Sequence, residues 1–121
     1  MYELRIEREF TAAHALKLYD GTMEPMHEHI WRVLVHVQSA ELDAMEVVMD
    51  FHELEKIVGG ALGPLDGTRL NDVKAFATVN PSAERVAEHI YKVIAPNLPL
   101  PVKLTCVTVT EAPGCRASFW Q

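Results

Sequence analysis

The strongest constraint on the fold is an alternation of side chains near both ends of the chain. In residues 2–12 one parity carries Tyr2, Leu4, Ile6 and Phe10, and the other carries Glu3, Arg5, Glu7 and Glu9. A period of two predicts a strand with one buried face. Residues 29–38, 102–110 and 115–120 predict three more strands. The apolar face of residues 29–38 consists of Trp31, Val33, Val35 and Val37.

Between these strands the spacing of apolar side chains changes to that of helices. Residues 51–62 carry one stripe, and Asp50 can cap its first turn. The stripe consists of Phe51, Leu54, Val58 and either Ala61 or Leu62. A second helix is expected from about Asn80-Pro81, with the proline in the first turn, to just before residues 97–99. Its stripe consists of Val86, Ile90, Val93 and Ile94.

The remaining segments are predicted to be mostly irregular. Residues 16–26 contain Asp20-Gly21 and Pro25 and predict a loop. Residues 42–46 should connect to a short strand at 47–49, and residues 65–78 should lack regular structure. The resulting order of strand, strand, helices, strand, strand is typical of an α+β protein with an antiparallel sheet. The length of 121 residues predicts one domain, residues 1–121.

Two helices can cover only one face of such a sheet. We expect the other face to carry Trp31, Val33 and similar apolar side chains, which an oligomer would bury. The alternative is a sheet whose outer face is polar. In residues 102–110 the second set of alternating positions, which includes Val107 and Val109, is also apolar. This favours the oligomer.

Composition and charge exclude several classes of function. Seventeen acidic against eleven basic residues give a net charge of −6, so a nucleic-acid partner is not expected. No apolar stretch is long enough to span a bilayer, and the N-terminus has no signal-peptide core, so we expect a cytoplasmic protein without a membrane partner. Cys106 and Cys115 allow one disulfide at most, and none is expected in that compartment.

Three of the six histidines indicate a metal site. His27 and His29 lie two residues apart at the entry to a strand, so their side chains project from the same face. His14 ends the preceding strand, which should pair with this one. Three imidazoles and an open position are the ligand set of a catalytic zinc ion. The alternative is unrelated surface or core histidines, the interpretation given to His36, His52 and His89.

Glu111 is a further candidate functional residue. It follows a strand of alternating Val and Thr, just before a turn. A carboxylate there can accept two hydrogen bonds from an N–C–N edge such as that of a guanine or pterin ring. A solvated glutamate at a strand end is the alternative.

These residues belong to a wider set of motifs by which the sequence resembles the 6-pyruvoyltetrahydropterin synthase and 6-carboxytetrahydropterin synthase family over nearly its whole length. The matching stretches, in order, are Phe10-Thr11-Ala12-Ala13-His14, His27-Glu28-His29, Val48-Met49-Asp50-Phe51, Leu65-Asp66, Leu70-Asn71, Pro81-Ser82-Ala83-Glu84-Arg85-Val86-Ala87 and Thr110-Glu111.

The resemblance implies a T-fold, in which a four-stranded antiparallel sheet carries two helices on one face. It implies that three subunits close into a barrel, that two trimers stack as a homohexamer, and that active sites lie between subunits. It also implies a Zn²⁺ ion held by His14, His27 and His29. A small pterin-like ligand would be anchored by Glu111, with Ser82, Ala83 and Glu84 contributing.

The chain departs from the usual family pattern at its catalytic positions. The loop before His27 has no cysteine base, and Gly67 stands where the family has the histidine of an Asp-His dyad, leaving Asp66 alone. The ordinary synthase reaction is therefore not expected. Glu24-Pro25-Met26-His27 resembles a variant in which glutamate is the base, which makes Glu24 and Asp66 the candidate catalytic residues.

These features support three hypotheses about function. In the first, the protein is a zinc-dependent lyase that cleaves the side chain of a dihydroneopterin compound, with Glu24 as base. In the second, it is a catalytically inactive homologue that binds a pterin or purine. In the third, it is a scaffold without a small-molecule site.

Overall fold

The computed structural model describes all 121 residues as one sheet with helices packed against it. The strands are β1 (Tyr2–His14), β2 (His27–Ser39), β3 (Thr68–Arg69), β4 (Lys103–Ala112) and β5 (Cys115–Phe119). The helices are α1 (Phe51–Leu62) and α2 (Ala83–Ile94), and short 3₁₀ turns occupy Leu70–Asp72, Lys74–Phe76 and Ala95–Asn97. The strand order is β3-β1-β2-β4-β5, antiparallel except for the parallel pair β3–β1.

The sheet therefore has five strands rather than the expected four. The additional strand, β3, lies in the stretch 65–78 that sequence patterning predicts to be irregular. Its two residues pair with Ala12 and Ala13. Just before it, the Gly67 amide donates to the Thr11 carbonyl at 2.7 Å, and the Thr11 amide donates to the Asp66 carboxylate at 2.9 Å. A strand of two residues is too short to leave an alternating pattern in the sequence.

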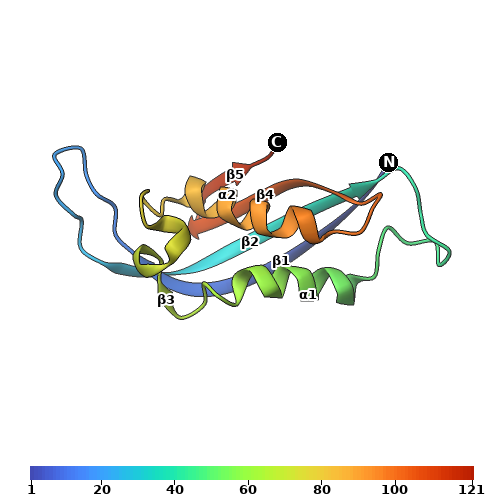
Figure 1. Ribbon diagram of the computed structural model, residues 1–121, viewed down its shortest axis with the longest axis horizontal. Helices are drawn as coiled ribbons and strands as arrows, with labels where there is room; N and C mark the ends of the chain where they lie inside the picture. Colours follow the sequence, from blue (N-terminus) through green and yellow to red (C-terminus); the bar gives the residue numbers. More distant parts are fainter.

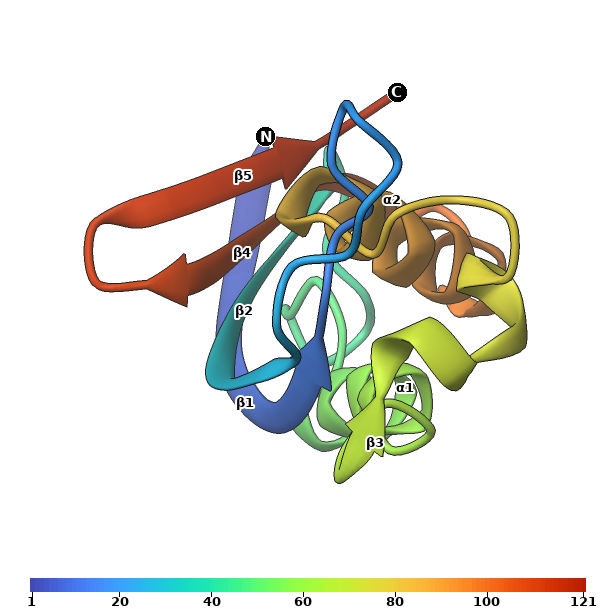
Figure 2. The same ribbon diagram turned by 90° about the vertical axis from the view of Figure 1, so that its left-hand side faces the viewer.

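Both helices lie on the same face of the sheet (Figures 1 and 2). Register places the apolar parities of the strands on that face, because Phe10 lies opposite Trp31 and Val33 lies opposite Val109. The buried residues of α1 are Leu54, Val58, Ala61 and Leu62, and those of α2 are Val86, Ala87, Ile90, Tyr91 and Ile94. An ion pair of 2.7 Å between Arg8 and Glu55 joins β1 to α1 at the edge of this layer.

The opposite face of the sheet is polar, which corrects the expectation that it carries Trp31 and Val33. Both side chains are completely buried under the helices, as are Val107 and Val109. The exposed parity carries charged residues such as Glu9 and Arg32, which lie 3.3 Å apart. The helices cover the apolar side chains of every long strand. No apolar face of the sheet is left uncovered, so the argument that an oligomer must bury such a face fails.

Three local expectations are also corrected. Residues 47–49 form no strand, because the Asp43 carboxylate accepts from the amides of Met45 and Val47 and curls the chain into a turn. The second helix starts at Ala83, with Ser82 as its N-cap, so Pro81 precedes the helix instead of lying in its first turn. Phe51 begins α1 but is 49% exposed and does not belong to the buried stripe.

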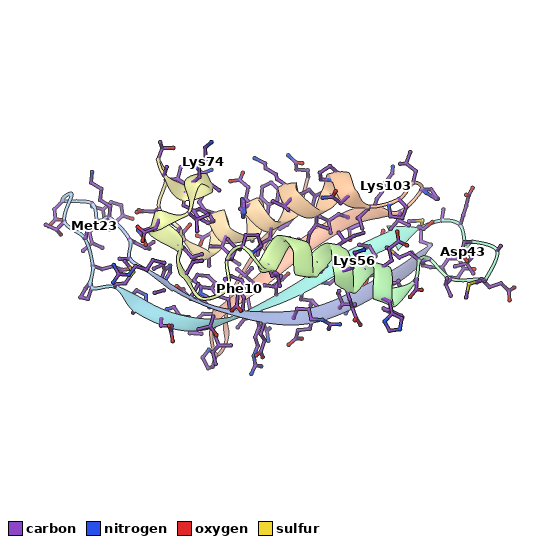
Figure 3. The ribbon with its side chains drawn as sticks, turned by 60° about the horizontal axis from the view of Figure 1, so that its bottom comes forward. Phe10, Met23, Asp43, Lys56, Lys74 and Lys103 are labelled. Carbon is purple, nitrogen blue, oxygen red and sulfur yellow. The ribbon has the colours of Figure 1, made fainter.

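The long axis of the molecule separates two loop regions. Figure 3 shows Met23, in the connection between β1 and β2, at one end and Asp43 at the other. Both cysteines are free. None of the helices has the length and apolar character needed to cross a membrane.

Candidate metal centre

The three predicted histidines converge where β1 ends and β2 begins. In the antiparallel register, His14 lies opposite His27, and His29 lies opposite Ala12. The ring centroids are 4.6 Å apart for His14 and His27, 4.8 Å for His27 and His29, and 5.3 Å for His14 and His29. Because this parity faces the helices, the imidazoles approach one another on the covered side of the sheet, while Glu28 points away and is exposed.

Peptide carbonyls fix the tautomers of two of these histidines. Nδ1 of His14 lies 2.8 Å from the carbonyl oxygen of Pro81, and Nδ1 of His27 lies 2.9 Å from that of Pro25. A carbonyl oxygen only accepts, so each Nδ1 carries the proton. Each Nε2 therefore presents a lone pair to the centre, an arrangement typical of histidines that bind metals.

Glu111, at the end of β4, completes a group of four candidate ligands. One ligand atom from each of His14, His27, His29 and Glu111 lies within 4.8 Å of all the others. The Glu111 carboxylate oxygen lies 2.7 Å from Nε2 of His14 and 3.6 Å from Nε2 of His29. The cluster thus contains three nitrogen ligands and one oxygen ligand, a donor set suited to zinc.

The state of His14 shows that the cluster fits a cation. His14 is 1% exposed, and its Nε2 makes no hydrogen bond despite its closeness to Glu111, because with the proton on Nδ1 both Nε2 and the carboxylate oxygen are acceptors. A buried polar nitrogen without a partner carries an energetic penalty. A cation shared with the carboxylate would satisfy both atoms. This observation supports a metal site independently of any resemblance.

Burial favours the neutral form of one histidine of the cluster, His29. Burial lowers the pKa of His29 below its usual 6.5, an effect that the nearby Glu111 carboxylate partly opposes. Trp31 lies beneath the cluster, with its ring 4.9 Å from that of His14, and its indole N–H donates to the Ala12 carbonyl at 3.2 Å. Neutral imidazole is the form that binds a metal ion.

Glu24 lies beside this cluster, in the loop that joins β1 to β2. Its carboxylate accepts from the Leu16 amide at 2.9 Å and lies 3.9 Å from Nε2 of His27. The Glu24 amide donates to the Leu16 carbonyl at 3.0 Å, so both ends of the residue are bound to Leu16. The predicted base is thus close to the metal centre and firmly held.

The other predicted site residues lie apart from the histidines. The Asp66 carboxylate is bound to the Thr11 amide, three residues before His14 and hence about 10 Å away along the strand. Ser82 accepts from the Arg85 amide as the N-cap of α2. Ala83 and Glu84 form the first turn of α2, which is connected to the cluster through the Pro81 carbonyl.

Sequence reasoning missed the residues that support the cluster. Asn71 and Asn80 bind the backbone of Ala15 and Lys17, the residues that follow His14, and the two prolines supply the carbonyls described above. The available signals were that Asn80 and Glu24 each precede a proline and that Asn71 lies in a stretch that matches the family. Such backbone contacts leave no periodic pattern.

An open hollow of about 1180 Å³ adjoins the cluster on the polar side of the sheet. His29 and Glu111 both line it, together with residues from β2, β4 and the turn before β5. Arg32 and Arg116 are its cationic residues. The side chains of His29 and Glu111 are themselves 25% and 29% exposed, so the cluster is open to solvent at these two residues.

Comparison with known proteins agrees with this geometry. Residues 3–121 match the family model described as 6-pyruvoyl tetrahydropterin synthase. The chain belongs to this family. It is 35% identical over 102 residues to the dihydroneopterin monophosphate aldolase of Pyrococcus furiosus, a match that covers 84% of this chain and 82% of that protein.

Solved structures of the family share the fold. The 6-pyruvoyl tetrahydropterin synthase of Caenorhabditis elegans superposes with a TM-score of 0.83 at 24% identity, covering 100% of this chain and 97% of that one. The Plasmodium vivax enzyme gives 0.79 at 19% identity over 99% and 97%. A P. vivax variant, in which a glutamate described as a catalytic residue is replaced by alanine, gives 0.80 at 18% identity over the same shares. The chain therefore has the T-fold.

Proposed function

We propose that the protein is a zinc-dependent lyase that cleaves the side chain of a dihydroneopterin-type substrate to give a 6-hydroxymethyl-dihydropterin. The observation that carries this proposal is the position of Glu24, whose carboxylate lies 3.9 Å from a histidine of the metal cluster. Membership of a family of lyases and the similarity to an aldolase that acts on dihydroneopterin monophosphate support it.

His14, His27 and His29 would hold the zinc ion, and Glu111 faces the same point. Zinc bound there supplies a Lewis acid that stabilises negative charge on a substrate oxygen. The carbonyls of Pro81 and Pro25 accept from Nδ1 of His14 and His27. The Nε2 atom of each of these two rings therefore carries no proton and faces the zinc position. The buried ring of Trp31 limits the access of water from beneath.

Glu24 would act as the general base. Its carboxylate takes the proton from the hydroxyl on the second carbon of the side chain, and the bond between the first and second carbons breaks. The second carbon leaves as an aldehyde, while the electron pair passes into the C6–N5 imine of the ring. Protonation of the first carbon then completes the hydroxymethyl product. A positioned base of this kind contributes about 10²- to 10⁴-fold in rate.

Two carboxylates are proposed to recognise the ring. Glu111 can accept from the N–C–N edge but also faces the histidines, so its replacement should weaken both zinc and pterin binding. Glu84 is exposed in the first turn of α2 beside Ser82 and Ala83, and its replacement should weaken pterin binding alone. Zinc content and pterin affinity of Glu111→Gln and Glu84→Gln separate the two roles.

The deciding experiment is a product assay on dihydroneopterin and its phosphates with zinc-loaded protein. Glu24→Gln should lose about 10²- to 10⁴-fold in turnover while still binding the pterin. Glu53→Gln is the matched control, because Glu53 is an exposed glutamate in the first turn of α1 and does not line the hollow beside the cluster. Unchanged turnover in Glu24→Gln would overturn the role of Glu24.

The same titrations test the other hypotheses. Saturable pterin binding by the zinc-loaded wild type without any product would identify an inactive binding homologue. The absence of a cysteine in the loop before His27 is the feature that favours that alternative. No binding of any pterin would leave a scaffold.

A further inference from the structure

Three consecutive residues after His14 are each fixed through their backbone by a different side chain. Ala15 exchanges two hydrogen bonds with the Asn71 amide group, of 3.0 and 2.8 Å. Lys17 exchanges two with the Asn80 amide group, of 2.7 and 3.0 Å. Between them, the Leu16 amide donates to the Glu24 carboxylate. Both asparagines thus bind the chain as a neighbouring strand would.

The two asparagines come from segments far from this turn in sequence. Asn71 lies in the 3₁₀ turn Leu70–Asp72, and Asn80 lies just before α2. Their contacts span 56 and 63 residues, so they attach the turn to the body of the protein. Beyond Lys17 the hairpin is held mainly by its own hydrogen bonds, and Leu18, Tyr19 and Met23 are exposed.

We infer that Asn71 and Asn80 are positioning residues for Glu24. They immobilise the residues on either side of Leu16, and Leu16 holds both the backbone and the carboxylate of Glu24. Without them, the Leu16 amide moves relative to His14, and the carboxylate moves with it. A displacement of about 1 Å at a reacting group can reduce a rate by about 100-fold.

This inference rests on the proposed role of Glu24 as the base. Asn80→Ala and Asn71→Ala should each lower kcat by about 10- to 100-fold, with a much smaller change in KM and with zinc content retained. Asn80→Asp keeps the oxygen that accepts from Lys17 and should recover part of the loss. Asn97→Ala is the matched control, because Asn97 makes a single bond to the Val93 carbonyl at the end of α2.

A double-mutant cycle distinguishes positioning from a general structural role. If Asn80 acts through Glu24, Asn80→Ala should have almost no further effect on kcat in a Glu24→Gln background. An equal loss in both backgrounds would overturn the inference. So would a kcat in Asn80→Ala equal to that of the wild type.

Amide hydrogen exchange provides a test that does not depend on turnover. Asn80→Ala should increase exchange of the Leu16 amide at least about 10-fold, while Asn97→Ala leaves it unchanged. Unchanged exchange would overturn the inference. If the wild type turns over no substrate, the proposed function fails, and the exchange result still decides whether the asparagines hold the anchor of Glu24.

Discussion

Individual histidines have distinct roles in this protein, and their surroundings separate those roles. His14, His27 and His29 face one another, whereas half-buried His89 packs edge-to-face against Phe76 at 5.3 Å. The sequence identified His27 and His29 because a strand places positions two apart on the same face, and it identified His14 through the expected pairing of the first two strands. The contribution of Glu111 to that cluster was missed, because only the pairing of β2 with β4 brings it there.

Replacing a cluster histidine should abolish stoichiometric zinc. His27→Gln removes a half-buried ligand at the cluster's edge, so the protein should still fold. We expect zinc affinity to fall by more than the ~10- to 100-fold that is typical when a residue that only hydrogen-bonds to a metal ligand is replaced. Elemental analysis and a competition titration with a chelator measure this. His52→Gln, which changes an exposed histidine in α1, should bind zinc as the wild type does.

His89 should make the fold sensitive to acid. Burial lowers the pKa of His89 below its usual 6.5, so the unfolded chain takes up a proton at a higher pH than the folded chain does. The free energy of unfolding should therefore fall as the pH drops from about 7 through that range. His89→Gln should reduce this fall. Urea titrations of zinc-free protein at several pH values test it, and an identical pH dependence in both proteins would contradict it.

At the scale of elements, the long strands and both helices were predictable, and the short or turn-bound segments were not. Alternation over nine or more residues defined β1, β2 and β4 to within a few residues. β3 and the turn at Asp43 depend on a few hydrogen bonds, including those that the Asp66 and Asp43 carboxylates accept from backbone amides, and no periodicity reveals these. The expectation that Trp31 and Val33 lie on the uncovered face of the sheet was wrong. Alternation shows that the two faces of a strand differ, but it does not show which face the helices cover.

The start of α2 combines a structural and a functional role. Ser82 caps the helix, and the Pro81 carbonyl before it fixes His14. Ser82→Ala should lower the free energy of unfolding by about 1 kcal/mol, whereas Ser82→Asp should retain most of the stability. Urea unfolding measures both. Pterin affinity measured on the same variants shows whether Ser82 also contacts the ligand.

At the scale of the whole molecule, one copy of the chain does not bring all the candidate catalytic residues together. Glu24 lies beside the metal cluster, whereas Asp66 is bound to Thr11 farther along the sheet. We propose that Asp66 serves the site of another copy in a homohexamer, as the resemblance implies. The polar outer face of the sheet provides no argument of its own for assembly.

Mixing experiments test this proposal. Glu24→Gln and Asp66→Asn subunits should each be nearly inactive alone and should regain activity when refolded or coexpressed together. Native mass spectrometry reports the oligomeric state of the same samples. Recovery without oligomers, or oligomers without recovery, would contradict a site shared between copies.

The hairpin between β1 and β2 has a consequence for how the chain tolerates changes in length. Leu16 and Glu24 are bound to each other, and a bridge joins Lys17 to Met23, so the stem cannot change length without displacing a residue at the metal centre. The tip at Tyr19–Thr22 is exposed, and its hydrogen bonds lie within the hairpin. Insertions such as a fluorophore tag or a peptide epitope should therefore be accepted at Asp20-Gly21 and rejected two residues to either side.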